Sequence, residues 1–286
     1  MKASGAAGSS ARRAEALGAR LPPLLVMAER VAATVAQGVH GRRRVGQGDS
    51  FWQYRPFHTG DSISRIDWRQ SAKSNRTFVR ESEWEAAQSV YLWRDGSSSM
   101  RWRSGAAVPH KIERAELLVL ALASLLVRGG ERVRLMGQPR RLALDGMAGV
   151  MAAEPESDGA LPEVALPAHA RVVLMGDFLS PLADIQASIA RLAAIPVGGH
   201  VLQVLDPAEA LLPYAGRVRF RGLEREAEAL IPRVEGVRDA YAQALAAQQD
   251  GLQALCRAAG FSFGVHRTDA SPNAALLALY TALSPQ

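Results

Sequence analysis

SVYLWRDGSSSM, residues 89–100, joins a run of apolar side chains directly to one carboxylate and three hydroxyl groups. The residues before Arg94 have the β-branched and aromatic character of a buried strand. Asp95, Gly96 and three consecutive serines follow at once. A buried strand that ends on this many oxygen atoms indicates a loop that either turns the chain into the next helix or holds a ligand.

Strands and helices alternate from this stretch to the C-terminus. Apolar runs predict strands over residues 90–93, 133–136, 170–176, 200–205 and 261–266, with a further short strand near 141–144. Helical spacing predicts helices over residues 111–127, 146–153, 181–194, 237–259 and 273–283. Helix-length crossovers between strands favour a mostly parallel central sheet with helices on both faces, which is a three-layer α/β domain over residues 89–286.

The N-terminal third has a different character. Residues 1–20 are rich in Ala, Gly, Ser and Arg and predict a flexible tail. Residues 21–88 predict an extension packed on the main domain, with an amphipathic helix that starts at Pro22 and ends before Gly38, and short strands after it. Aromatic residues are dense between positions 41 and 86, so this segment is expected to pack although it is rich in charge.

Composition limits the class of protein. With 286 residues, 48% of them hydrophobic and 22% charged, the chain is long enough for a large core. Its one cysteine, Cys256, is expected to be a small buried apolar residue. The longest apolar run, residues 117–127, is too short to span a membrane, and no secretory signal follows Met1. These features predict a cytoplasmic protein without a membrane span.

The net charge of +6 raises the alternative of a basic scaffold that binds nucleic acid. The distribution of the charge argues against it. Basic residues lie in the tail, at Arg42–Arg44 and in mixed-charge segments such as 221–225, without a lysine-rich helix or aromatic residues interleaved with basic ones. Nucleic-acid binding is therefore the weaker interpretation.

Three aspartates follow three of the predicted strands. Asp95 follows the opening strand, Asp177 follows ARVVLMG, and Asp206 follows VLQVL. Ligands of parallel α/β sheets bind outside the carboxyl ends of the strands. The three carboxylates are therefore expected to share one edge of the sheet.

The serine loop has the spacing of a cation site. Asp95, Ser97 and Ser99 alternate along the loop, and Gly96 adds backbone freedom. Oxygen ligands with few carboxylates suit Mg²⁺, which retains some of its water. The alternative is that the serines only cap the following helix.

The sequence also resembles known families. DGSSS after SVYLWR resembles the D-x-S-x-S motif of the von Willebrand factor type A fold, whose metal-ion-dependent adhesion site uses the Asp and both Ser of the motif. Asp177 in LMGDF matches the later aspartate of that site. GDSISRIDWRQSAKSNRTFVRESEWE, and RTDAS near the C-terminus, resemble the family called domain of unknown function 58, and this likeness covers roughly residues 40–286.

One ligand of the adhesion site is missing. The site normally includes a Thr from an intermediate loop, but the sequence has no Thr between Thr77 and Thr268. Ser157 is the expected substitute, and Asp158 beside it and Asp206 are further candidates. The resemblance thus implies Mg²⁺ held by Asp95, Ser97, Ser99 and Asp177, with an incomplete ligand set.

A second charged group lies in the N-terminal extension. It consists of Asp61, Arg65, Asp67, Trp68, Arg80, Glu81 and Glu83. Each acid has an Arg within a few residues, and Arg keeps a carboxylate ionised instead of poised for proton transfer. We expect a salt-bridge network that fastens the extension, with a partner-facing role as the alternative.

Enzyme signatures are absent from the sequence. The six histidines are scattered without H-E-x-x-H spacing, and neither G-x-S-x-G nor a phosphate-binding P-loop occurs. The family resemblance implies instead an adaptor or co-chaperone whose partner is a MoxR-type AAA+ ATPase and which acts on protein clients. The competing class is a metal-dependent hydrolase that uses Asp95 and Asp177.

Overall fold

The computed structural model describes residues 23–37, 51–57, 66–73, 76–82, 88–223 and 227–283. The chain forms two compact units, one made of the residues up to Gly38 together with those from Gln88 onward, the other of Val39–Ala87. The amphipathic helix predicted near the N-terminus spans residues 23–37 and belongs to the first unit. Its Glu29 accepts a hydrogen bond of 2.8 Å from Ser124 of that unit.

The first unit contains a parallel sheet of five strands in the order β4-β3-β5-β6-β9. The strands are β3 (Ser89–Arg94), β4 (Arg132–Leu135), β5 (Arg171–Gly176), β6 (Gly198–Leu205) and β9 (Phe261–Arg267). Because β3, β5 and β6 are neighbours and parallel, their carboxyl ends lie side by side at one edge of the sheet. The sequence predicted the parallel arrangement but not this order.

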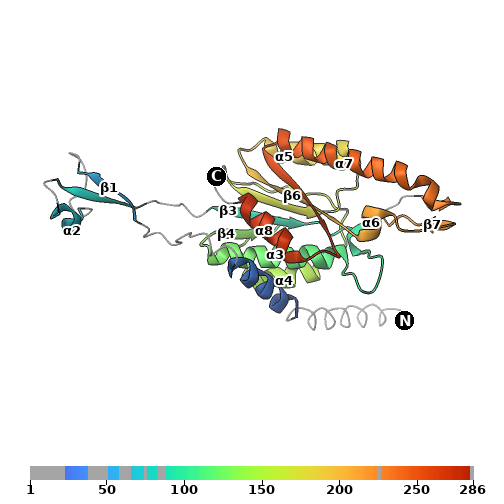
Figure 1. Ribbon diagram of the computed structural model, residues 1–286, viewed down its shortest axis with the longest axis horizontal. Coiled ribbons are helices and arrows are strands. Elements are labelled where there is room, and N and C mark those ends of the chain that lie inside the picture. Colours follow the sequence, from blue (N-terminus) through green and yellow to red (C-terminus); the bar gives the residue numbers. More distant parts are fainter. Residues whose placement is uncertain are drawn as a thin grey trace, which may run out of the picture. The chain divides into compact units, whose positions relative to one another are not determined.

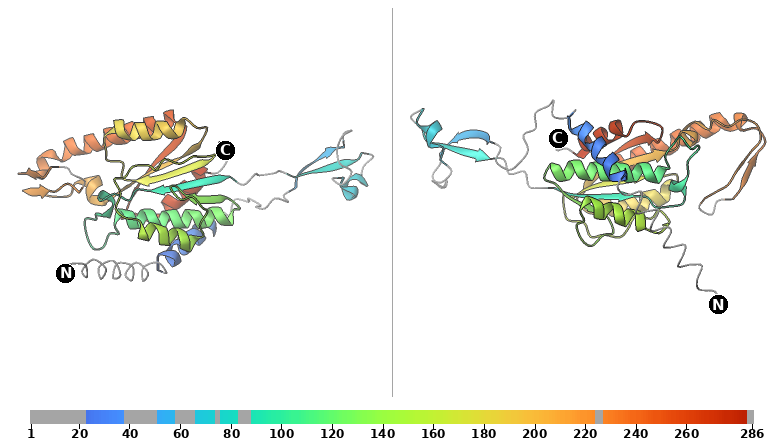
Figure 2. Two further views of the ribbon diagram at one scale, coloured as in Figure 1. Left: turned by 180° about the vertical axis from the view of Figure 1, so that it is seen from behind. Right: turned by 90° about the horizontal axis from the view of Figure 1, so that it is seen from below.

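Helices cover both faces of the sheet, so the unit has the three layers that the sequence predicted (Figures 1 and 2). Helices α5 (Leu182–Ala193) and α7 (Arg238–Ala258) pack together on one face. Helices α3 (Lys111–Arg128), α4 (Leu144–Ala153) and α8 (Pro272–Leu283) contact one another through α3 on the other.

Helix α3 is the most buried helix of this unit. Every residue from Leu117 to Leu126 is buried, as the apolar run predicts for a core helix. In the part of the chain that is described, no helix combines the length and the apolar character needed to cross a bilayer. Cys256 on α7 is also fully buried, and burial raises the pKa of its thiol to about 11, so it is an inert packing residue as predicted.

Three local features differ from the sequence prediction. The strand expected near 141–144 is absent, because α4 already begins at Leu144 and Pro139 precedes a segment that pairs with no strand. The sequence did not predict the short helix α6 (Pro207–Leu211). It also did not predict the antiparallel pair β7 (Val218–Phe220) and β8 (Ala229–Ile231), which flanks the mixed-charge segment from Arg221.

The second unit contains an antiparallel pair of strands, β1 (Phe51–Pro56) and β2 (Phe78–Ser82), with an irregular register between Phe51 and Gln53. A single helical turn, α2 (Trp68–Ser71), lies between them in the chain. These elements agree with the short strands expected after Gly38.

Candidate functional site

The three strand-end aspartates lie at the carboxyl edge of the sheet. The backbone N–H of Asp95 donates to the carbonyl oxygen of Met175 at 2.8 Å, which carries the β3–β5 pairing one residue beyond β3. Asp95, Asp177 and Asp206 are 7%, 5% and 0% exposed. The expected juxtaposition of Asp95 and Asp177 is therefore present, and both carboxylates are largely withdrawn from water.

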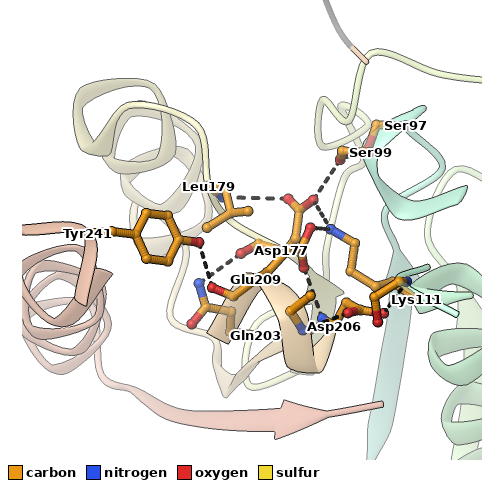
Figure 3. A network of polar contacts seen from close by, with 11 residues as sticks. Ser97, Ser99, Lys111, Asp177, Leu179, Gln203, Asp206, Glu209 and Tyr241 are labelled. Atoms are coloured by element: carbon orange, nitrogen blue, oxygen red, sulfur yellow. Dashed lines mark hydrogen bonds and ion pairs between the residues drawn. The ribbon is translucent and has the colours of Figure 1, made fainter. Parts of the chain in front are cut away.

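The serine loop is tied to Asp177 by hydroxyl groups. The Oγ atoms of Ser97 and Ser99 lie 3.1 Å apart, and Ser99 Oγ donates to Asp177 Oδ2 at 2.6 Å (Figure 3). Asp95 Oδ1 accepts the backbone N–H of Ser97 at 2.8 Å, which closes the loop on itself. The short helical turn after the loop, η2 (Ser99–Arg101), has no side-chain cap from Ser98. The hydroxyls of Ser97 and Ser99 thus form a chain of contacts that ends on Asp177, and they do not cap a helix.

Lys111, the first residue of α3, contacts Asp177 at this site, and the sequence analysis did not predict its role. Its side chain is fully buried, and Nζ donates to Asp177 Oδ2 at 2.9 Å and to Glu209 Oε1 at 2.5 Å (Figure 3). Burial lowers the pKa of Lys111, but the attraction of the two carboxylates outweighs burial and raises it above its ordinary value. The side chain is therefore an ammonium ion, a cation supplied by the protein itself.

Asp206 has a structural role at this edge. Its Oδ1 accepts the N–H of Ala208 at 2.8 Å and its Oδ2 accepts the N–H of Ser104 at 2.9 Å. Its own N–H donates to Glu209 Oε2 at 2.9 Å, so Asp206 and Glu209 form the capping box of α6. Both oxygens of Asp206 are committed to backbone groups, and its effect is to position Glu209 toward Lys111.

Two side-chain amides, one of them fully buried, and a tyrosine bond to the backbone and side chains around Asp177 and Glu209. Gln203 Nε2 donates to the carbonyl oxygen of Asp177 at 2.8 Å, and Gln249 Nε2 donates to Gln203 Oε1 at 3.0 Å. Tyr241 donates its hydroxyl to the carbonyl oxygen of Glu209 at 2.5 Å (Figure 3). Burial raises the pKa of Glu209, and the neighbouring ammonium of Lys111 opposes that rise.

The loop expected to replace the missing Thr lies beside the serine loop. The N–H of Ser157 donates to the carbonyl oxygen of Gly96 at 3.2 Å, and a Cβ on Gly96 would lie 3.0 Å from Ser157 Oγ. Ser98 donates its hydroxyl to Glu156 in the same loop. Asp158 is exposed, and its Oδ1 accepts the N–H of Ala160 in its own loop at 3.0 Å. Ser157, not Asp158, is placed against the serine loop.

Two glycines leave the space that Asp95 occupies. A Cβ on Gly159 would lie 3.1 Å from Asp95 Oδ1, and a Cβ on Gly176 would lie 3.1 Å from Asp95 Cβ. Gly159 also has φ +74°, a conformation that other residues rarely adopt. Asp95 therefore fits at this position because residues 159 and 176 have no side chain.

Arg94, which precedes Asp95, ties the serine loop to α3 and α4. It is 5% exposed, and Nη2 donates to the carbonyl oxygen of Met151 at 2.8 Å. Ion pairs with Glu154 at 2.9 Å and Glu116 at 3.4 Å compensate its charge. The strand therefore ends on a buried guanidinium next to a buried carboxylate.

The charged group predicted in the N-terminal extension is described in part. Asp67 caps α2, with Oδ1 accepting the N–H of Gln70 at 2.9 Å, and Trp68 is 66% exposed. Arg80 and Glu81 lie on β2, opposite Tyr54 and Gln53. Asp61, Arg65 and Glu83 lie outside the described residues. The salt-bridge network remains a prediction.

The candidate site has no conventional cluster of metal ligands. Among the described residues, no three His, Cys, Asp or Glu side chains are grouped so that they could hold a metal ion. The oxygen atoms that do converge come from the carboxylate of Asp177 and the hydroxyls of Ser97 and Ser99, with Asp95 beside them. Any cation at this edge would depend on hydroxyl ligands.

Comparison with known proteins identifies the family. Uncharacterized proteins of Mycobacterium bovis and Mycobacterium tuberculosis are each 25% identical over 258 residues, which is 82% of this chain and 80% of theirs. The solved structure of an aerotolerance-related membrane protein from Bacteroides fragilis aligns with 68% of this chain and 98% of its own (16% identity, TM-score 0.42). A conserved hypothetical protein BatB from Bacteroides thetaiotaomicron aligns with 69% and 97% (18% identity, TM-score 0.38). Residues 53–251 match the family model described as protein of unknown function DUF58, and the chain belongs to that family.

Proposed function

We propose that this chain is a non-catalytic protein-interaction module that binds partners at the carboxyl edge of its central sheet. One observation carries the proposal: Ser97, Ser99 and Asp177 form a continuous chain of contacts of 3.1 and 2.6 Å, with the carboxylate of Asp95 directly beside it. This is the arrangement expected if the D-x-S-x-S loop forms an adhesion-type site of a von Willebrand factor type A-like domain.

The candidate ligands are of the chemical type that Mg²⁺ prefers. Asp95, Ser97, Ser99 and Asp177 offer only oxygen atoms, which hard divalent cations require, and Ser157 lies where a further hydroxyl could join them. Lys111 already neutralises part of the charge of Asp177. The proposed Mg²⁺ would therefore be bound weakly, and it would complete the site by offering a coordination position to an acidic side chain of the partner.

The proposed partner is a MoxR-type AAA+ ATPase, with this chain as its adaptor or co-chaperone toward protein clients. Support comes from the family resemblance of the segment from Gly60 to Glu85 and of the serine loop. An acidic side chain of the ATPase or of a client would occupy the open position of the cation.

The electrostatics support binding over hydrolysis. A serine nucleophile needs a neutral base close to its hydroxyl. Lys111 is linked to Ser99 through Asp177, but its raised pKa keeps it protonated, so it cannot accept the proton. Asp177 Oδ2 accepts hydrogen bonds from both Ser99 and Lys111, so this oxygen is already engaged by two donors of the protein.

A binding measurement tests this function. The full chain is immobilised and titrated with the MoxR-type ATPase from the same organism, with Mg²⁺ or with a chelator in excess. We expect binding that weakens about tenfold or more on chelation and in Asp95→Ala, because a partner carboxylate then loses its cation. Asp250→Ala, an exposed aspartate on α7, is the matched control and should bind normally. Equal binding with and without Mg²⁺ would refute the adhesion site, and absence of binding would refute the ATPase as partner.

A further inference from the structure

We propose that a cavity at the opposite, amino end of the sheet binds a small molecule that carries phosphoryl groups. The cavity is open to solvent and has a volume of about 670 Å³, and its polar lining is Ser89, Tyr91, Arg134 and the exposed Arg132 and Arg141. Ser89 and Arg132 are the first residues of β3 and β4, whereas the candidate adhesion site follows the last residues of β3 and β5. The cavity is thus separate from the site described above.

Strand register brings these side chains to one face. Ser89 is paired with Arg132, and Tyr91 with Arg134, in the parallel ladder of β3 and β4. Residues two apart on a strand point to the same side of the sheet. Arg141 joins them from the segment between β4 and α4.

Among the described residues, the three arginines of the cavity have no carboxylate partner. In the described part of the chain, no carboxylate pairs with Arg132, Arg134 or Arg141, whereas buried Arg94 has two such partners. Guanidinium groups that line one cavity repel each other, and an anion bound between them would relieve that repulsion. Each guanidinium presents a planar fork of N–H donors that matches the oxygens of a carboxylate or a phosphate and not a halide. Three guanidinium groups around one cavity further favour a phosphoryl group over a lone carboxylate, because it offers more oxygens and more negative charge.

Tyr91 supplies an independent observation. Its side chain is 7% exposed and packs in the core, yet within the described residues its hydroxyl has no hydrogen-bond partner. The hydroxyl oxygen itself is not enclosed in the core but is open to solvent where Tyr91 lines the cavity. Since Tyr91 lines the cavity, its hydroxyl is available to donate a hydrogen bond to an anion bound there.

The size and the apolar wall of the cavity narrow the ligand further. Small-molecule sites usually measure roughly 300–1,000 Å³, so about 670 Å³ is more than one phosphate ion needs. Leu166 and Pro167 form an apolar wall that suits the organic part of a phosphorylated molecule.

Arginines also occur on edge strands because their charge discourages pairing with other chains, and β4 is an edge strand. That role does not account for Arg141, which lies outside the strand, or for Tyr91, which lies on an interior strand.

Calorimetric titration of the full chain tests the proposal, with inorganic pyrophosphate and ADP as probes at constant ionic strength. We expect saturable binding at one site per chain that weakens about tenfold or more in Arg134→Gln, since a charge-assisted hydrogen bond to the anion is lost. Tyr91→Phe should weaken it severalfold. Arg191→Gln on α5, an exposed arginine paired with Glu163, is the matched control and should bind normally.

The two probes also distinguish the source of the phosphoryl group. If ADP binds more tightly than pyrophosphate, the apolar wall contacts the nucleoside. If the two bind equally, the protein recognises the phosphoryl groups alone. The proposal is overturned if neither probe binds saturably at constant ionic strength, or if Arg134→Gln binds as tightly as the natural chain while both show the same unfolding transition. Asp95→Ala should leave this binding unchanged, so the result is independent of the proposed adhesion site.

Discussion

Lys111 Nζ lies 2.9 Å from Asp177 Oδ2, inside the fold and beyond the reach of solvent. The lysine begins the most buried helix, and the aspartate follows a central strand. The ion pair therefore joins the helical layer to the carboxyl edge of the sheet. Together with Glu209 at 2.5 Å, it gives the candidate site an internal cation whether or not a metal is bound.

Lys111→Met should destabilise the fold strongly. The substitution leaves the buried carboxylate of Asp177 and the partly buried carboxylate of Glu209 without their counter-ion, and loss of one partner from a buried ion pair costs about 3–5 kcal/mol. Denaturant unfolding at neutral pH measures the free energy of unfolding. Arg128→Met, which removes an exposed pair with Glu29, is the matched control and should cost less than about 1 kcal/mol. Equal losses in the two variants would contradict the role assigned to Lys111.

The double variant Lys111→Met with Glu209→Gln tests whether the loss comes from unpaired charge. Neutralising Glu209 removes one of the two uncompensated carboxylates, so the double variant should be less destabilised than the sum of its single variants. A coupling energy on the order of 0.5–3 kcal/mol is expected for residues in contact. Strict additivity would show that Lys111 does not stabilise the fold through its charge interaction with Glu209.

The sequence predicted the edge of the sheet but not the contacts across it. Asp95 and Asp177 could be placed together because each follows an apolar strand, and parallel strands end at one edge. The order of the strands is set by long-range packing, which periodicity does not encode. The role of Asp206 was readable in part: D-P-A-E at 206–209 has Asp, Pro and Glu at the first positions of a helix, which is the pattern of a capping box.

Lys111 escaped prediction because a lysine next to an apolar run usually lies at the exposed end of a helix. Its partners are distant in sequence, and only the fold brings them together. One signal was available, since the chain has 3 lysines against 31 arginines, and one of the three begins the core helix. Arginine would not fit so readily, because its planar fork needs more partners than a compact ammonium.

Gly159→Ala should disturb the site beyond its cost in backbone strain. The new Cβ would lie 3.1 Å from Asp95 Oδ1, so the carboxylate must move. Gly130→Ala is the matched control, because Gly130 also has positive φ, at +89°, but no atom lies within 4 Å of its added Cβ. Each substitution should cost on the order of 1 kcal/mol in strain. Only Gly159→Ala should weaken Mg²⁺-dependent partner binding, and equal effects of the two on binding would contradict the contact with Asp95.

Two buried histidines should make the fold sensitive to acid. Burial lowers the pKa of His200 from 6.5 to about 4, and burial together with Arg114 lowers that of His266 to about 4. The unfolded chain then binds more protons than the folded chain between these values. Above pH 6.5 the two histidines do not reduce the free energy of unfolding. As the pH falls from 6.5 toward 4, each histidine lowers the free energy of unfolding by up to about 1.4 kcal/mol per pH unit.

Denaturant unfolding across this pH range checks the prediction. His200→Gln should remove about half of the slope that the two histidines give. His169→Asn, at an exposed position with φ +63° that Asn tolerates, should leave the slope unchanged. A slope that His200→Gln does not reduce would show that other groups govern the acid sensitivity.

Lys111→Met should also change the affinity of the proposed cation site, in the direction opposite to its effect on stability. The ammonium on Asp177 Oδ2 repels a second cation and occupies an oxygen that Mg²⁺ would share. Removing one unit charge about 4 Å from a bound cation is worth at least about 1 kcal/mol even at the dielectric constant of water. Titration calorimetry with Mg²⁺ on the folded variant should therefore show an affinity several-fold to tenfold higher than that of the natural chain. Unchanged or weaker Mg²⁺ binding would mean that Lys111 and the metal do not compete for Asp177, and would place the cation elsewhere or exclude it.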